Sequence, residues 1–215
     1  MELKIVFEND HLVLLNKPAG VLTVPSRIGE NDSRPCLGTF LQEVKQTQIF
    51  PVHRLDVEVS GLVLYAKTAL AHKTSNLWFE HKLIHKTYAA YTEGEPNLAV
   101  GVQVEWKCKL LRGKKRAYES PVGKDSLTLA TFLGKKEKGL LWDLSPVTGR
   151  SHQLRYELYR HGFPILGDNL YNSTQPWPHG IALCSYALHL DKIPEQNRLG
   201  LPISLQISPF SDNIK

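Results

Sequence analysis

The sequence has little cysteine and no long apolar run. Its three cysteines, Cys36, Cys108 and Cys184, lie far apart among 215 residues, and no Cys-x-x-Cys or cysteine–histidine spacing indicates zinc. The N-terminus lacks the basic segment and apolar stretch of a secretory signal, and no apolar run is long enough to cross a bilayer. These absences argue against a disulfide-rich secreted protein and a membrane-spanning one. We expect reduced thiols and a cytoplasmic location without membrane contact.

A strong charge of either sign is also missing. Charged residues make up 22% of the chain, hydrophobic residues 42%, and the formal net charge is +5. This is a globular composition whose modest basic excess favours acidic partners such as nucleic acid without identifying one. The length suits a single domain over residues 1–215, with two lobes dividing near the turn at 93–101 as the alternative.

Apolar periodicity predicts more strands than helices. A short helix is expected from Leu37 to Val44, and a third with Thr148 as cap and residues 150–160 as body. Between them, a second helix is expected after a Thr68 cap, with an apolar side made of Leu70, Ala71, Thr74, Leu77 and Trp78. Because the strands mostly follow one another directly, the pattern predicts an α+β fold with a mostly antiparallel mixed sheet and flanking helices. The expected strands cover residues 4–7, 12–15, 62–66, 86–91, 102–110, 127–133, 140–144, 181–190 and 203–207.

The most informative segment is His53-Arg54-Leu55-Asp56, which runs through a Ser-Gly pair into an apolar strand. An Asp on a turn at the mouth of a strand can be held rigidly and still reach a substrate. Taken alone, an Arg-x-Asp pair is more often a surface or structural ion pair, so the motif needs support from the rest of the chain.

A second polar segment opens the late helix, with the sequence Thr148-Gly149-Arg150-Ser151-His152-Gln153-Leu154-Arg155. First-turn amides favour an anion, and His152 and Arg155 are expected to share a face. A capped, solvated helix start is the alternative interpretation for such a segment on its own.

Both segments resemble signatures of the RluA-type pseudouridine synthases. The first is similar to the family's HRLD motif and the second, continued through His161-Gly162 and Gly167-Asp168 to Tyr171, to its second long motif. Segments 79–90, with Lys86-Thr87-Tyr88, and 13–22, with Asn16-Lys17-Pro18, are similar to two further family segments, so the resemblance extends from about residue 5 to residue 171. It implies the pseudouridine synthase fold with a central active-site cleft.

The resemblance also implies roles for individual residues. The family breaks a C–N glycosidic bond of uridine and rejoins the ribose to carbon 5 of the uracil, so the nucleotide must be flipped out of its stack. The implied catalytic residues are Asp56 at the sugar, Tyr88 facing the base and Arg155 keeping Asp56 ionised. Whether Asp56 attacks carbon 1′ or removes the carbon 2′ proton stays open. The expected RNA-binding residues are Arg54, which enters the vacated space, and His53, Arg150, His152, Lys86, Lys114, Lys115 and Arg116.

Two departures from the family pattern concern substrate choice. Val57 stands where a basic residue is common, and Val59 where Thr is common. The small N-terminal RNA-binding appendage of many relatives is not expected here, so the basic segment from Lys107 to Lys124 is a candidate substitute that contacts phosphates. A solvated hairpin is the alternative interpretation of this charge run.

The expected activity is therefore isomerisation of uridine in structured RNA, either ribosomal RNA or transfer RNA, by a monomer. The reaction has no redox step or external group transfer, so we expect no cofactor and no metal. His81 and His85 are spaced like a metal pair but lack an evident third ligand. A non-catalytic RNA-binding protein with the same fold is the main alternative. A hydrolase using Cys, His and Asp is weaker, because no cysteine lies in a nucleophile-like turn.

Overall fold

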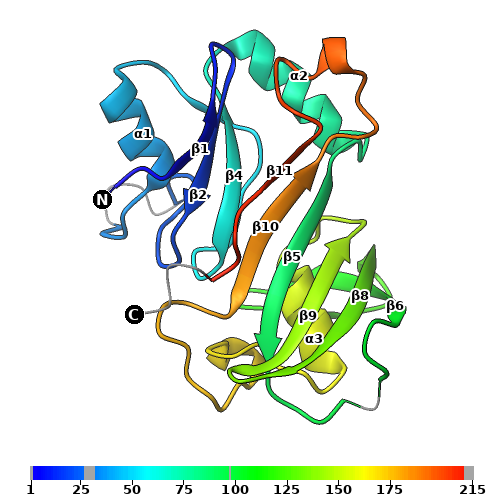
Figure 1. Ribbon diagram of the computed structural model, residues 1–215. Helices are drawn as coiled ribbons and strands as arrows, with labels where there is room; N and C mark the ends of the chain where they lie inside the picture. Colours follow the sequence, from blue (N-terminus) through cyan, green and yellow to red (C-terminus); the bar gives the residue numbers. More distant parts are fainter. Residues whose placement is uncertain (1, 27–31, 97, 211–215) are drawn as a thin grey trace. The chain divides into compact units, whose positions relative to one another are not determined.

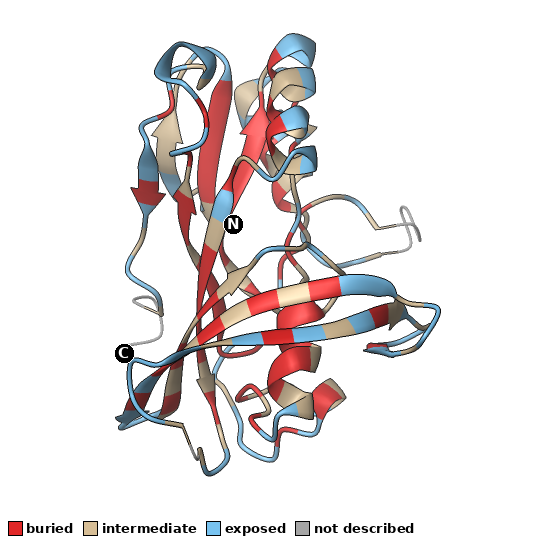
Figure 2. Cartoon of the chain, turned by 90° about the vertical axis from the view of Figure 1, so that its right-hand side faces the viewer, coloured by how far each residue is buried: buried red, intermediate tan, exposed pale blue. Residues whose placement is uncertain are grey.

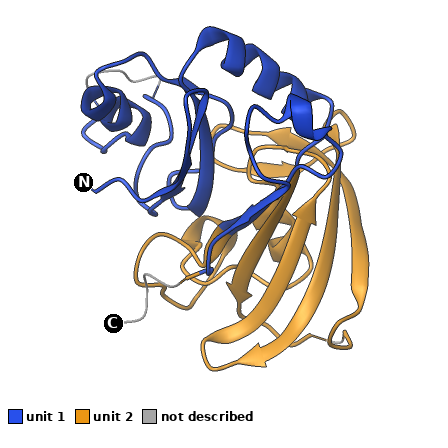
Figure 3. Ribbon diagram, turned by 45° about the horizontal axis from the view of Figure 1, so that its top comes forward, with its two compact units in different colours: residues 1–84, 185–209 blue, residues 85–184, 210–215 orange. Residues whose placement is uncertain are grey.

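The computed structural model describes residues 2–26, 32–96 and 98–210. The chain forms two compact units (Figure 3). The first contains residues 1–84 and 185–209, and the second contains residues 85–184 and 210–215. The unit boundaries fall at 84/85 and 184/185, whereas the turn at 93–101 lies wholly inside the second unit. None of the described helices is long and apolar enough to span a membrane.

The first unit is a sheet with two helices (Figure 1). Within it β1, β2, β4 and β10 are neighbours in that order, β3 pairs with β4, and β11 pairs with β10. The pairs β1–β2, β2–β4, β3–β4 and β10–β11 are antiparallel. Its elements are β1 (Ile5–Glu8), β2 (Leu12–Lys17), α1 (Leu37–Lys45), β3 (Phe50–Pro51), β4 (Ser60–Ala66), α2 (Ala69–Glu80), β10 (Leu183–His189, which crosses the unit boundary), a 3-10 turn (Glu195–Asn197) and β11 (Ser204–Gln206).

Strands β2 and β4 are buried on both faces. Leu12, Leu14, Leu62 and Leu64 belong to one apolar cluster together with Trp78 of α2. The alternate side chains of the same strands, Val13, Leu15, Val63 and Tyr65, are also fully buried, as are Leu37 and Leu41 of α1. A strand covered on both faces reads as a continuous apolar run, which is why the sequence around residues 62–66 shows no alternation.

The second unit is an antiparallel sheet with one helix (Figure 1). Its strand order is β5-β9-β8-β6-β7. Its elements are β5 (His85–Thr92), β6 (Gln103–Arg112), β7 (Ala117–Glu119), β8 (Lys124–Lys136), β9 (Gly139–Pro146), α3 (Gln153–Arg160) and a 3-10 turn (Asn169–Tyr171).

Buried and exposed residues alternate along β8, and in Figure 2 the outer strands show bands of both classes. Aromatic side chains form much of this unit's core. Trp142 is fully buried and lies within 5.6 Å, centroid to centroid, of Trp106, Phe132 and Phe163. Its indole N–H donates to Thr92 Oγ1 at 2.9 Å, so the one polar atom of the ring is satisfied.

The α+β fold with a mostly antiparallel sheet is confirmed, and every predicted strand and helix is present. Thr68 caps α2 as predicted, accepting from the Ala71 N–H at 3.1 Å. The predicted apolar side of α2 is partly wrong. Leu70 is 74% exposed, while the buried stripe is Ala71, Ser75 and Trp78, at i, i+4 and i+7. Short β3 and β7 were not predicted, because two or three residues show no periodicity.

Candidate active site

The turn that carries Asp56 connects β3 to β4 in the first unit and is held by its neighbours on both sides. Leu55 is buried, and the Thr23 hydroxyl accepts from the Leu55 N–H and donates to the Leu55 carbonyl, both at 3.1 Å. The Val59 N–H donates to the Asp56 carbonyl at 3.1 Å and closes the turn. Asp56 itself is half-buried, as a group that must meet a substrate requires.

Lys17 lies fully buried beside this turn. Its Nζ donates to the carbonyl oxygens of Val21 at 2.8 Å, Pro18 at 2.9 Å and Val57 at 3.3 Å. Burial lowers the pKa of Lys17 to about 7, against the opposing attraction of the Glu58 and Asp56 carboxylates. The Asn16-Lys17-Pro18 segment therefore supports the Asp56 turn directly, a role that sequence analysis had not assigned to Lys17.

The residue at position 61, in the Ser-Gly pair after the turn, must be glycine for steric reasons. Gly61 has φ +115°, and a Cβ there would lie 2.2 Å from the Ser185 carbonyl oxygen of the neighbouring strand β10. Only glycine permits this approach, so residue 61 fixes how β4 leaves the turn.

His53 and Arg54 differ in exposure. His53 Nε2 accepts from the Leu64 N–H at 3.1 Å, and its ring stacks on Phe79 at 4.7 Å. These contacts hold the start of the turn, and RNA contact by His53 stays a prediction. Arg54 is exposed, which suits a side chain that enters RNA.

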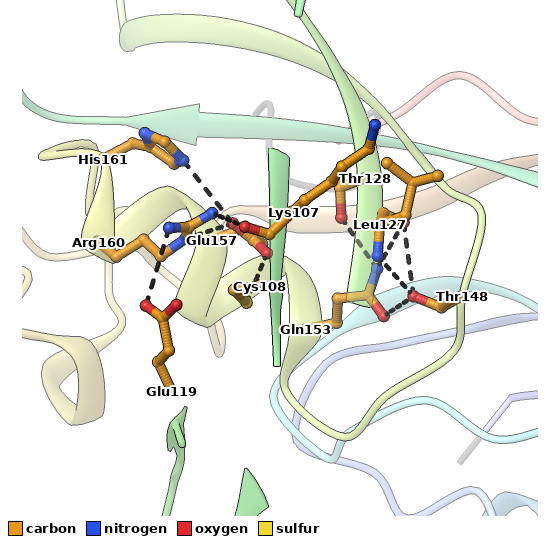
Figure 4. Close-up of polar contacts among 10 residues, drawn as sticks. All are labelled: Lys107, Cys108, Glu119, Leu127, Thr128, Thr148, Gln153, Glu157, Arg160 and His161. Atoms are coloured by element: carbon orange, nitrogen blue, oxygen red, sulfur yellow. Dashed lines mark hydrogen bonds and ion pairs between the residues drawn. The ribbon is translucent and has the colours of Figure 1, made fainter. Parts of the chain in front are cut away.

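In the second unit, α3 begins later than predicted. The helix starts at Gln153, and its N-cap is His152, which has a left-handed φ of 55°. Thr148 is not the cap. Its hydroxyl accepts from the Leu127 N–H at 3.0 Å and donates to Gln153 Oε1 at 2.7 Å (Figure 4). Helical spacing therefore does not relate His152 to Arg155, because His152 precedes the helix, but both side chains contact Tyr171.

Arg155 is buried and forms a bidentate ion pair with Asp168. Its Nε lies 2.7 Å from Oδ2 and its Nη2 2.8 Å from Oδ1, and the two side chains are 2% and 1% exposed. The guanidinium also lies 5.4 Å from the centroid of the buried Tyr171 ring. Such a forked pair fixes the orientation of the cation. Asp168 belongs to the continuation of the second motif, but no spacing in the sequence indicates that it pairs with Arg155.

Tyr171 connects the Arg155–Asp168 pair to the basic hairpin, which consists of β6, β7 and the loop at 113–116 between them. Its hydroxyl accepts from the Ala117 N–H at 2.8 Å and lies 3.1 Å from His152 Nδ1. Ala117 opens β7, directly after the loop of Lys114, Lys115 and Arg116. All three basic side chains are exposed.

The surface beside the hairpin is hollowed. A cavity of about 630 Å³ is lined by Lys107, Lys109 and Thr148 among others. Arg150 is anchored nearby, since its Nε donates to the Asp125 carbonyl at 2.8 Å. Glu119 and Asp125 also line this cavity and balance the charge of its two lysines, so the cavity by itself indicates no anionic ligand.

A buried carboxylate ties α3 to β6. Glu157 is fully buried and pairs with Arg160 at 2.7 Å, while the Cys108 thiol donates to it at 3.1 Å (Figure 4). Burial and this carboxylate raise the pKa of the Cys108 thiol to about 12, so it stays protonated. Arg160 also donates to the Lys107 carbonyl at 2.9 Å. This set of contacts is structural and supports the helix that carries Arg155.

Tyr88 and Lys86 lie on β5. Tyr88 is 8% exposed and pairs in register with Leu144 of β9. The predicted site residues thus fall into two groups. His53, Arg54 and Asp56 belong to the first unit, and the second group, in the second unit, consists of Lys86, Tyr88, Lys114, Lys115, Arg116, Arg150, His152 and Arg155.

The model of one family, described as RNA pseudouridylate synthase, matches residues 11–159. The chain belongs to this family. Its members named RNA pseudouridine synthases catalyse an isomerisation of RNA, and the chain is an RNA pseudouridine synthase on this evidence. The matched range contains both the Asp56 turn and the Arg155 helix.

Relatives of this pseudouridine synthase align over most of its length. The Bacillus subtilis protein named uncharacterized RNA pseudouridine synthase YhcT is 30% identical over 233 residues, covering 100% of this chain and 70% of the relative. Two proteins named dual-specificity RNA pseudouridine synthase RluA are 37% identical over 176 residues (Vibrio cholerae, 78% of this chain and 67% of the relative) and 33% identical over 177 residues (Escherichia coli, 80% and 78%).

Two solved structures share the synthase's fold. Human RNA Pseudouridylate Synthase Domain Containing 1 superposes with a TM-score of 0.77 at 20% identity, covering 100% of this chain and 86% of that one. Domain Containing 4 gives 0.71 at 20% identity, covering 96% and 88%. The non-catalytic alternative receives no support from these comparisons.

Proposed function

We propose that this pseudouridine synthase modifies specific uridines in structured ribosomal or transfer RNA, with Asp56 acting at the ribose of a flipped nucleotide. The observation that carries the proposal is the Asp56 turn, which holds a half-buried carboxylate on a backbone secured by Thr23 and Lys17. A group that acts at a sugar carbon needs this combination of rigid backbone and access.

Arg155 is the proposed partner of Asp56. A carboxylate in a partly dehydrated site tends to protonate, and a nearby guanidinium counters this tendency. Nε and Nη2 of the guanidinium donate to Asp168, and this forked pair fixes the orientation of the cation. Asp168 is then a positioning residue for Arg155. Arg150 is the next candidate for the partner.

The remaining roles follow from residue type and placement. Exposed Arg54 enters the space left by the flipped base, and Tyr88 offers its ring to that base. His53, Arg150, His152 and the loop at 114–116 contact the RNA backbone. Isomerisation transfers no electron or external group, so the reaction requires no cofactor or metal. We further propose a monomer in the cytoplasm, in keeping with three cysteines that form no disulfide.

The test is pseudouridine mapping of total RNA from cells that lack the gene, complemented with wild type, Asp56→Asn or Glu58→Gln. Asp56→Asn preserves shape and removes the charge, so we expect the site-specific signal to be lost while RNA binding persists. Glu58→Gln is the matched control, because it removes a carboxylate from the same turn and should leave the signal intact. Product formation by the Asp56→Asn variant would refute the mechanism. The position that loses signal identifies the RNA.

A further inference from the structure

Lys86, the second residue of β5, is a cation without a partner. Its side chain is half-buried, and among the described residues its ammonium group forms no hydrogen bond or ion pair. Burial lowers the pKa of this ammonium group. A partly desolvated ammonium group that no described residue pairs is open to an anionic ligand, which would compensate its charge. The feature therefore indicates an anion that the protein binds.

The side chain reaches the turn that precedes α3. A Cβ built on Gly149 would lie 3.6 Å from Lys86 Nζ, so the ammonium group is next to the Gly149 backbone. Gly149 and Ser151 are exposed, and neither backbone N–H donates to a residue that the structure describes. Exposed backbone N–H groups in a turn can bind an anion, and a neighbouring ammonium group strengthens that preference.

The position of Lys86 relative to Tyr88 narrows the choice of anion. Side chains two residues apart on a strand point to the same face and are separated by about 6.7 Å. Both residues lie in β5, which is regular from His85 to Thr92. That separation is comparable with the distance between the base and the phosphate of one nucleotide.

We propose that the Lys86 ammonium group and the turn at 148–151 form a binding site for one phosphodiester group of the RNA, that of the nucleotide whose base contacts Tyr88. The site rests on the proposed function for its identity as an RNA site. Lys86 then contacts one particular phosphate group of the RNA.

The first measurement is the affinity of the full chain for a short oligouridylate at several salt concentrations. Each phosphate contact to a single strand contributes about 0.7 to the slope of log affinity against log salt. Lys86→Met should reduce the slope by about that amount, while Lys86→Arg should retain the wild-type slope. Lys136→Met, which removes an exposed cation at the end of β8, is the matched control and should change nothing. An unchanged slope in Lys86→Met, or equal losses in the Met and Arg variants, would overturn the proposal.

The second measurement separates a ligand site from a structural role. Lys86→Met removes a half-buried charge that no described residue pairs, so the denaturation midpoint of the RNA-free protein should stay the same or rise. A lower midpoint would overturn the proposal, because it would show that Lys86 stabilises the fold. Gly149→Ala should keep the midpoint, since 3.6 Å is an ordinary contact and Gly149 has no positive φ, but should weaken oligouridylate binding several-fold by filling the site.

The same proteins distinguish this inference from the proposed function. Wild-type pseudouridine formation on total RNA tests the activity, and the salt slope of Lys86→Met tests the subsite. An active wild type with an unchanged slope in the variant would overturn the subsite alone. An inactive wild type with a reduced slope would overturn the proposed activity and leave an anion site that binds RNA phosphate.

Discussion

Asp168→Asn tests the contact that we expect to matter most for the Arg155 helix. The substitution keeps the size of the side chain and removes its charge. Asp168 lies 1% exposed and accepts from Arg155 Nε at 2.7 Å and Nη2 at 2.8 Å. The Asn amide cannot accept both donors, so the variant leaves a guanidinium that is 2% exposed without its matching carboxylate.

The magnitude follows from this burial. Breaking a buried ion pair by removing one partner costs about 3–5 kcal/mol, because the remaining charge is not compensated. For a chain of this size, 1 kcal/mol corresponds to roughly 2–4 °C in Tm. Asp168→Asn should therefore lower the Tm by about 6–20 °C. Pseudouridine formation should also fall, since Arg155 loses the group that orients it.

The assay is thermal unfolding and urea unfolding, both followed by circular dichroism, paired with single-turnover kinetics at a temperature where each variant is folded. Glu119→Gln is the control, because Glu119 is 53% exposed and lies 3.9 Å from Arg160. An exposed pair contributes about 0–1 kcal/mol, so this variant should behave like wild type.

A double variant separates stability from function. Arg155→Met with Asp168→Leu replaces the pair by apolar side chains of similar volume, which is often neutral or stabilising in a buried site. We expect recovered stability without recovered activity. A loss below about 1 kcal/mol in Asp168→Asn would refute the reasoning, and full activity in the stable double variant would remove Arg155 from the catalytic group.

Two further predictions concern the hairpin and Lys17. Replacing Lys114, Lys115 and Arg116 with Ala should lower the slope of log RNA affinity against log salt by somewhat under one unit per lost contact. The single-turnover rate at saturating enzyme should not change, and Lys135→Ala is the control. An unchanged slope would show that the loop is a solvated surface without RNA contacts. The pKa of Lys17 is about 7 in the folded protein and near 10.5 in the unfolded one, so between these pH values the unfolded state binds the extra proton. The free energy of unfolding of the wild type should therefore rise with pH across this window, by up to about 1.4 kcal/mol per pH unit relative to Lys17→Met. Urea unfolding at several pH values is the measurement, and parallel profiles of the two proteins would contradict the assigned pKa.

Much of the fold could be predicted from local patterns. The apolar run at 62–66, the alternation in β6 and the Thr68 cap each depend on neighbours in sequence, and each is confirmed. The error in α2 has a different origin. Both Leu70 and Trp78 are apolar, but only the packing of α2 decides that Trp78 is buried while Leu70 is exposed. Periodicity does not distinguish two overlapping apolar stripes on one helix.

The start of α3 shows the same limit. Thr148 is a good capping residue by type, yet its hydroxyl is engaged by Leu127 and Gln153. The helix therefore begins at Gln153, three residues later than predicted, with His152 in a left-handed conformation. The competing partner, Leu127, comes from another strand, and no local pattern predicts it.

The sequence by itself determined the α+β class, the family and the residue types that the reaction needs, because motifs and periodicity are properties of consecutive residues. Tertiary structure alone decided which groups support them. Lys17 secures the Val57 carbonyl across 40 residues, Asp168 orients Arg155 across 13, and Tyr171 links Ala117 to His152. These contacts form between segments that are distant in sequence. A buried cation is stable only where such segments place carbonyl or carboxylate oxygens next to it. Lys86 has no such partner among the described residues, and we propose that an RNA phosphate compensates its charge.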